Sequence, residues 1–486
     1  MVCGFSKEVF AMKKRLLAAL LSAVLLLTLV PTAFAASDLD GHWAKKYIDY
    51  LADEDVINPS ATTGKYQPDA KVTRAEFMRY INRAFHFTET ASISYTDVPK
   101  SAWYYETVCI AQKYGYINGV GSGKMDPTGT VTREQAATII GRLYKADPGN
   151  VSPSSLDFKD KAKISSWSAG YIRAAVDKGF LAGYSDGTFQ PTREVTRGEV
   201  AKIIYYYLGT SLSRAGKAYT GADLRGDTTN VTISESCTLS DATIEGDLFI
   251  TEGLGTDAVA LSNVTVEGMI IISGGTVTMT NTTSDHIIVS SSMGRLLQTT
   301  ATGASRFSEA KVRTAAVLYE KVLTDGYDGF ENVTVCGGNK VSLTVDADLL
   351  KLTVNAPATV TTTAAAKVYH LRANRAATVT GYGSVYQADV RTDGVSFTKD
   401  VALGGYTLAS GVSVSVAGEN RTASSTAAVS PSSVILDLGD EESLADGVEF
   451  SLPSGVTAEK LLLDSSELAG TAFETTSRGL RVKADT

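Results

Sequence analysis

Three arginines of the chain stand in the same short phrase. Arg74, Arg133 and Arg197 each follow Val-Thr and precede a Glu or Gln by two residues. Thr-x-x-Glu or Thr-x-x-Gln ahead of an apolar run is typical of a capping box, in which threonine and acid each accept a backbone N–H of the first helical turn. The sequence therefore predicts three helices that begin at these phrases. Their N-caps are Thr73, Thr132 and Thr196.

Helix capping explains the threonine and the acid but not the arginine. A cation at the first helical position is disfavoured by the helix dipole by a few tenths of a kcal/mol. A helix N-terminus attracts anions, and a guanidinium there adds a planar fork for a carboxylate or phosphate. Two interpretations stay open: the arginines bind an acidic ligand, or they form structural ion pairs. On the first interpretation, replacing an arginine costs binding and little folding stability.

Each phrase belongs to a repeated unit of about sixty residues. A tryptophan lies about thirty residues upstream of the arginine and begins an apolar stripe with helical spacing. A loop with glycine and proline follows, and a second helical stripe begins at the phrase. A helix–loop–helix unit of this size buries little core alone, so we expect the three to pack together. The tryptophans are Trp43, Trp103 and Trp167.

The repeated units resemble surface-layer homology (SLH) domains, over residues 38–90, 95–148 and 156–212. The resemblance rests on Asp97-Val98, Phe158-Lys159-Asp160, the tryptophans, the Ser185-to-Pro191 loop and the Thr-Arg phrases. It implies an all-α trimer of pseudo-threefold units whose grooves bind a secondary cell-wall polysaccharide. That polymer often carries a pyruvate ketal, whose carboxylate would suit the arginines.

The same resemblance implies which residues contact the polymer. Tryptophan has a second interpretation, because a large core anchor would also recur in each unit. The loop of the first unit has Pro59 and Thr63 where the third unit has glycine and aspartate, so we expect Arg74 to matter less. The implied polymer-binding residues are Arg74, Arg133, Arg197, Trp43, Trp103, Trp167, Asp186, Gly187 and Gly123.

The chain begins with the features of a secretory signal peptide. A basic segment from Met12 to Arg15 precedes an apolar run and the small-x-small site Ala33-Phe34-Ala35, so we expect cleavage after residue 35. The mature chain then has no other segment that could span a membrane. Removing a net charge of +3 from a total of −8 leaves −11, which argues against nucleic-acid binding. The three remaining cysteines form neither a disulfide framework nor a zinc site, and we expect no metal or cofactor.

Residues 216–420 change to a composition rich in Thr, Val, Ser, Gly and Ala. Residues 243–250 align with 265–272 at an offset of about 22, and 352–360 with 371–379 at about 19. Short strands at such a period favour a parallel β-solenoid, with an array of β-sandwiches as the alternative. Residues 305–322 fit either a helix or two strands around a turn.

Residues 428–486 resemble a partial immunoglobulin-like module. They include an acidic run at 437–446, interpreted as a solvated loop, and are few for such a sandwich, which suggests a fragment or an incomplete sequence.

Hydrolase, metalloprotease and phosphate-loop motifs do not occur, and the four histidines are scattered. Asp346 and Asp348 alternate on a predicted strand, where a solvated face is a simpler interpretation than a calcium site. We therefore expect a non-enzymatic, secreted protein of the bacterial cell wall or S-layer, anchored by its SLH units and displaying a structural or adhesive β-region. Possible partners are surface-layer or other surface proteins. The alternatives are a wall-anchored polysaccharide-degrading enzyme and a β-rich binding module for a carbohydrate or a partner protein.

Overall fold

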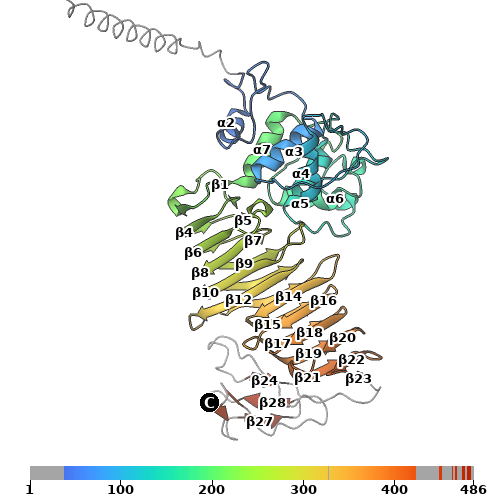
Figure 1. The fold of residues 1–486 in the computed structure, drawn as a ribbon, viewed down its shortest axis with the longest axis vertical. Coiled ribbons are helices and arrows are strands. Elements are labelled where there is room, and N and C mark those ends of the chain that lie inside the picture. Colours follow the sequence, from blue (N-terminus) through green and yellow to red (C-terminus); the bar gives the residue numbers. More distant parts are fainter. Residues whose placement is uncertain are drawn as a thin grey trace, which may run out of the picture.

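The computed structural model describes residues 38–422 apart from residue 327, together with five short strands between residues 448 and 482. A helical part lies at one end of a long stack of strands (Figure 1). The expected signal peptide, the acidic run and most of the expected immunoglobulin-like module lie outside the described residues. Of that module the structure gives β24 (Val448–Phe450), β25 (Leu462–Leu463), β26 (Ser466–Glu467), β27 (Phe473–Thr476) and β28 (Gly479–Val482).

The helical part contains the three predicted helix–loop–helix units. The first helix of each unit packs on the second helix of the preceding unit, and the first unit closes the ring on the third. Among the described residues no helix is long and apolar enough to cross a membrane. The helices of the units are α2 (Lys45–Asp53), α3 (Arg74–Ala84), α4 (Tyr105–Tyr114), α5 (Arg133–Leu143), α6 (Ala169–Asp177) and α7 (Arg197–Leu208).

A closed ring of backbone hydrogen bonds marks the pseudo-threefold axis. The N–H of Val72 donates to the carbonyl of Val195 at 3.1 Å, and Val195 donates to Val131 at 2.9 Å. Val131 completes the ring by donating to Val72 at 3.1 Å. The valine of each repeated phrase therefore joins the units at their common centre.

The β-rich region is a parallel β-solenoid of about 11 turns, as the repeat spacing predicted. The sandwich alternative is wrong, because each strand from β1 to β20 pairs in parallel with the strand two places later in the chain. The predicted offsets are the rung spacing: Thr243 lies beside Thr265, and Leu352 beside Leu371. Residues 305–322 form two strands, not a helix.

Two stacks of strands build the solenoid, and a final hairpin strand, β23 (Glu419–Thr422), pairs antiparallel with β22. The first stack comprises β1 (Thr210–Leu212), β3 (Val231–Ile233), β5 (Leu248–Ile250), β7 (Met269–Ile272), β9 (Thr283–Val289), β11 (Arg306–Val312), β13 (Gly329–Val335), β15 (Asp348–Val354), β17 (Lys367–Ala373), β19 (Ser384–Val390) and β21 (Ala402–Leu408). The second comprises β2 (Lys217–Thr220), β4 (Cys237–Ile244), β6 (Ala258–Val266), β8 (Thr276–Thr280), β10 (Leu297–Gly303), β12 (Ala316–Leu323), β14 (Val341–Asp346), β16 (Ala358–Thr362), β18 (Ala377–Gly381), β20 (Val395–Phe397) and β22 (Ser413–Val416).

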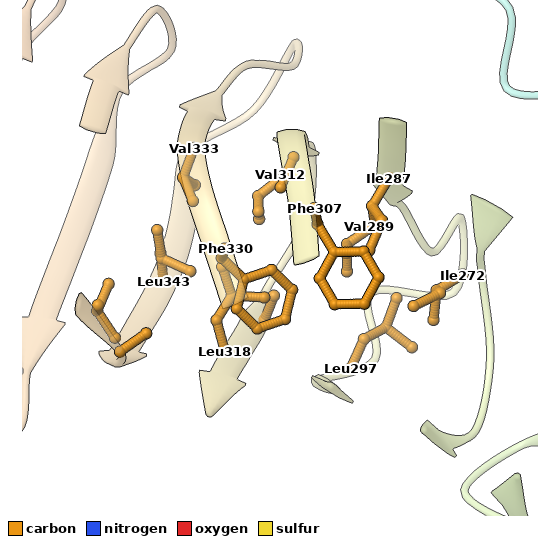
Figure 2. Packing of buried hydrophobic residues seen from close by; sticks show 14 of the residues in the cluster. Ile272, Ile287, Val289, Leu297, Phe307, Val312, Leu318, Phe330, Val333 and Leu343 are labelled. Carbon is orange, nitrogen blue, oxygen red and sulfur yellow. The ribbon is translucent and has the colours of Figure 1, made fainter. Parts of the chain in front are cut away.

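Apolar side chains from both stacks fill the solenoid interior. Phe307 and Phe330 occupy equivalent places on neighbouring rungs, with ring centroids 5.3 Å apart. Leu297 and Leu318 of the second stack pack beside them (Figure 2). Since every other residue of most strands points inward, each rung buries a row of apolar side chains against the next rung.

The prediction that Asp346 and Asp348 share one strand is wrong. Asp346 ends β14 and Asp348 begins β15, with a bend at the buried Ala347 between them. Asp348 forms an ion pair with Lys367 at 2.6 Å, and Asp346 accepts a hydrogen bond from Thr363. The two carboxylates are therefore held by separate local contacts.

The helical part and the first rungs pack as one body. Phe249, Ile271 and Ile288 of the solenoid belong to the apolar core of the helical units. Asp247 and Glu252 are each only 3% exposed; Tyr144 donates to Asp247 at 3.1 Å, and Lys145 pairs with Glu252 at 2.7 Å. Two further solenoid side chains bond the last carbonyls of α7. They are Asn230, which donates to Tyr206 at 3.0 Å, and Thr232, which donates to Leu208 at 2.8 Å.

Candidate functional site

All three predicted capping boxes are present. In the first, the Thr73 hydroxyl accepts the N–H of Glu76 at 3.2 Å, and the Glu76 carboxylate accepts the N–H of Thr73 at 3.0 Å. The same pair of bonds joins Thr132 to Gln135 and Thr196 to Glu199. The threonine and the Glu or Gln of the phrase are therefore helix caps, as predicted.

The helix N-termini have further partners in the neighbouring unit. The N–H of Arg74 donates to Gly129 at 2.8 Å, and that of Ala75 donates to Pro127 at 2.9 Å. Equivalent bonds run from α5 to the third unit and from α7 to the first. They are Arg133 to Arg193, Glu134 to Pro191, Arg197 to Ala70 and Gly198 to Pro68. Because protein carbonyls accept these first N–H groups, the helix ends do not offer them to a ligand.

The Arg133 guanidinium extends into the loop of the third unit and is 6% exposed. Its Nε donates to the Phe189 carbonyl at 2.8 Å, and Nη2 donates to the Ala182 carbonyl at 2.7 Å. It also lies over the rings of Tyr184 and Phe189, 4.5 and 4.9 Å from their centroids. Burial lowers the pKa of this guanidinium.

Arg74 makes equivalent contacts with the second unit, and burial likewise lowers its pKa. Its Nε donates to Met125 at 2.9 Å and Nη2 donates to Asn118 at 2.8 Å, both at backbone carbonyls. Each arginine thus bonds the carbonyls on both sides of a short glycine-containing loop of the next unit, residues 119–124 or 183–188. Arg74 and Arg133 therefore do not form the structural ion pairs that were one of the two interpretations of the sequence, since these acceptors are backbone carbonyls.

Arg197 differs, because it meets the divergent loop of the first unit. It donates to the Tyr66 carbonyl at 3.2 Å and to the Gln67 side chain at 3.1 Å. Its guanidinium also forms an ion pair with Glu76, the capping residue of α3. Burial opposes ionisation of Glu76, but hydrogen bonds from Thr73 and Arg197 outweigh it and lower the pKa. At this interface the structural ion pair is present.

The three tryptophans lie on the surface, so the core-anchor interpretation is wrong. Trp43, Trp103 and Trp167 are 52%, 56% and 52% exposed. Each tryptophan lies two residues before the first helix of its unit. That helix packs on the second helix of the preceding unit. The tryptophans therefore stand at the three seams between units.

One of these seams contains a groove of about 620 Å³. Trp103 forms one wall, and the Arg79 guanidinium lies 4.7 Å from the centroid of its ring. Arg83, one turn further along α3, also lines the groove. Arg79 Nε is buried without a hydrogen-bond partner in the described part of the chain. The groove thus combines an exposed indole with two guanidinium groups. Five carboxylates also line it, those of Glu54, Asp55, Glu106, Glu235 and Asp257.

Sequence reasoning missed Arg79 and Arg83, because it compared the copies only at their shared positions. The equivalent residues are Thr138 and Arg142 in α5, and Lys202 and Tyr206 in α7. The two arginines stand four residues apart, so they lie on one face of the helix. That spacing, which is unique to the first copy, was the available signal.

The predicted loop residues shape the loop itself. Gly123 and Gly187 have φ of 68° and 82°, which glycine adopts without strain. Asp186 accepts the hydroxyl and the N–H of Thr188 at 2.7 and 2.9 Å, and these bonds lower its pKa. Three other aspartates each accept two backbone N–H groups at the end of a loop; they are Asp38, Asp97 and Asp160. The sequence identified Asp97 and Asp160 only as part of the resemblance, without this role, and it did not identify Asp38.

Comparison with known proteins agrees with this architecture. The S-layer homology domain matches residues 37–78, 94–137 and 157–201. The chain therefore carries three tandem S-layer homology domains, which mark it as a cell-surface protein.

Curated relatives are similar over the S-layer homology region. An amylopullulanase of Thermoanaerobacterium thermosulfurigenes is 32% identical over 36% of this chain and 10% of its own length. A surface-layer 125 kDa protein of Lysinibacillus sphaericus is 26% identical over 37% of this chain and 16% of its own length. A cellulosome-anchoring protein of Acetivibrio thermocellus is 34% identical over 23% of this chain and 24% of its own length. The chain thus spans a small part of these relatives.

Proposed function

We propose that the S-layer homology triplet holds this protein non-covalently at the cell wall by binding an acidic, pyruvylated secondary cell-wall polysaccharide. The groove between Trp103 and α3 carries the proposal. An exposed indole offers a flat apolar surface to a sugar ring, and the neighbouring guanidinium groups suit a carboxylate. The surface-layer and cellulosome-anchoring names of two relatives support the same role.

Different residues of the site have different roles in this proposal. Trp103 stacks on a sugar ring, while Arg79 and Arg83 bind the acidic group. Arg74 and Arg133 act mainly as positioning residues, because they hold the loops that border the seams. Trp43 and Trp167 are the equivalent stacking surfaces at the other two seams, where fewer cations line up along the helix.

Sedimentation with purified cell wall tests the groove. We expect Trp103→Ala and Arg79→Gln each to weaken the binding of the full mature chain by about 2 kcal/mol, roughly thirtyfold. Arg375→Gln is the matched control, since Arg375 lies exposed in the solenoid and donates to its neighbour Asn374. Wall from which the pyruvate ketal has been removed should bind the wild-type chain as weakly as the variants. Undiminished binding of both groove variants would contradict the assignment.

We further propose a structural or adhesive, non-enzymatic role for the solenoid. Its second stack presents hydroxyl rows on the outer face, such as Thr359, Thr378 and Ser396, in adjacent strands. A uniform row favours repeated weak contacts over a single reactive centre. The amylopullulanase relative makes a polysaccharide-degrading enzyme the competing proposal. Release of reducing ends from starch, xylan or cell-wall polymer by the purified mature chain would establish that alternative.

A further inference from the structure

A second pocket lies where the helical triplet meets the solenoid. It has a volume of about 370 Å³, within the range of small-ligand sites. All three helical units line it, as do the solenoid strands β5 and β7 and the residues that follow β9 and β11. It is separate from the Trp103 groove, with which it shares only Phe87.

Aromatic side chains from the helical units and from β5 form one wall of this junction pocket. Phe87 and Tyr114 stack with centroids 3.9 Å apart, and Tyr207 stacks on Phe249 of β5 at 4.6 Å. All four side chains are buried in the packing between the units and the first rungs. The pocket is therefore held by the packed junction.

The charge of the pocket is positive although the chain is acidic overall. Lys145 is neutralised by Glu252, which also accepts the N–H of Ser292 at 2.6 Å. Arg142 and Arg313 have no carboxylate partner among the residues that the structure describes. Arg142 makes a long bond of 3.5 Å to the Tyr116 carbonyl and donates to the Asn118 side-chain oxygen at 3.2 Å. Arg313 donates to the Lys145 carbonyl. Most N–H groups of these two guanidinium groups therefore have no acceptor among the described residues and can donate to a ligand.

We propose that the junction pocket binds an anionic monosaccharide or another organic anion of that size. Arg142 from the last turn of α5 and Arg313, directly after β11, would hold the anionic group between them. The aromatic wall would contact the ring. A carboxylated and a phosphorylated sugar share this chemistry, since a guanidinium forks onto either group. The site requires both parts of the chain.

Titration calorimetry of the full mature chain with glucuronate, glucose 6-phosphate and neutral glucose tests the proposal. We expect at least one anion to bind with a Kd on the order of 1 mM or lower, and glucose at least tenfold more weakly. The preferred anion identifies the group that the arginines hold. Absence of binding by both anions, or equal binding of glucose, would overturn the proposal.

Two variants locate the binding. Arg313→Gln removes one guanidinium, and Ala146→Phe fills the pocket without changing a charge. We expect both to weaken anion binding at least tenfold while sedimentation with cell wall stays unchanged, which separates this site from the groove. Arg375→Gln again serves as the control. A thermal melt checks the fold of each variant; a well-folded Ala146→Phe chain that binds the anion normally would place the ligand elsewhere.

Discussion

Replacing Arg133 by alanine should destabilise the helical triplet, contrary to the expectation from sequence that the arginine contributes little to stability. The side chain is buried, and its two hydrogen bonds cross from α5 to the loop of the third unit. Alanine would leave the carbonyls of Phe189 and Ala182 without this donor and would open a space beneath the Tyr184 ring. Both effects raise the free energy of the folded state and so lower the free energy of unfolding.

The magnitude follows from these contacts. A hydrogen bond from a charged donor contributes about 1.5–3 kcal/mol, so losing two predicts roughly 3–6 kcal/mol. Relief at the helix N-terminus returns no more than about 1 kcal/mol. Desolvation of the guanidinium, which lowers its pKa, also reduces the net contribution. We therefore expect a loss of about 3 kcal/mol.

Urea unfolding followed by tryptophan fluorescence measures this loss selectively. All three tryptophans of the chain lie in the triplet, at positions 43, 103 and 167. The solenoid therefore contributes no tryptophan fluorescence. With an m-value of roughly 2 kcal/mol per molar, the midpoint should fall by about 1.5 M. Arg173→Ala is the control, because Arg173 is exposed and bonds only Ser155 in the part of the chain that the structure describes.

The outcome separates the two interpretations of the repeated arginine. A lowered midpoint with wall binding retained under native conditions assigns Arg133 to the interface between units. An unchanged midpoint with binding lost would refute the reasoning and make Arg133 a direct ligand of the polymer. Arg133→Lys should recover little stability, since one ammonium cannot reach both carbonyls with the geometry of the planar fork.

Two further predictions concern single side chains. Thr73→Ala removes the cap of α3 and should lower the triplet's stability by about 1 kcal/mol, whereas Thr73→Ser should retain it; tryptophan-detected urea unfolding distinguishes them. Glu320→Gln should flatten the pH dependence of solenoid unfolding, followed by circular dichroism. Burial raises the pKa of Glu320 from 4.5 to about 7, so the folded state binds the extra proton. Wild-type stability should therefore fall from pH 5 to pH 8, by at most about 3 kcal/mol, and an equal slope in both proteins would refute this assignment.

Features encoded within a few residues of one another could be predicted from the sequence. The capping boxes depend on a threonine and an acid three positions apart, and the solenoid on strands that repeat at the rung spacing. The partners of the arginines could not be predicted in this way. Arg133 bonds a carbonyl that is 56 residues away, in a unit whose position depends on the packing of all three.

The error at Asp346 and Asp348 has a different cause. The buried Ala347 between two polar residues continues the alternation of a strand, although the backbone bends there. A solenoid corner can keep an inward apolar residue while changing direction. Alternation therefore identifies which side chains point inward, but it does not show where one strand ends and the next begins.

The junction between the triplet and the solenoid illustrates how burial changes a strand pattern. In the sequence, the composition changes where the β-rich region of residues 216–420 begins. Yet the runs Leu248–Ile250, Ile270–Ile272 and Ile287–Val289 are apolar at every position and buried throughout. A strand that is apolar at every position is typical of a sheet covered on both faces.

The apolar pattern therefore records which rungs the helices cover. From β11 onward the alternation returns: Ala310 and Val312 are buried and Lys311 between them is exposed. The covered rungs contribute Phe249, Ile271 and Ile288 to the helical core, and their carboxylates pair with cations of the helical units. Because a packed apolar face and buried ion pairs resist bending, the triplet fixes the direction in which the solenoid leaves it. A triplet bound to the wall would thus also orient the solenoid.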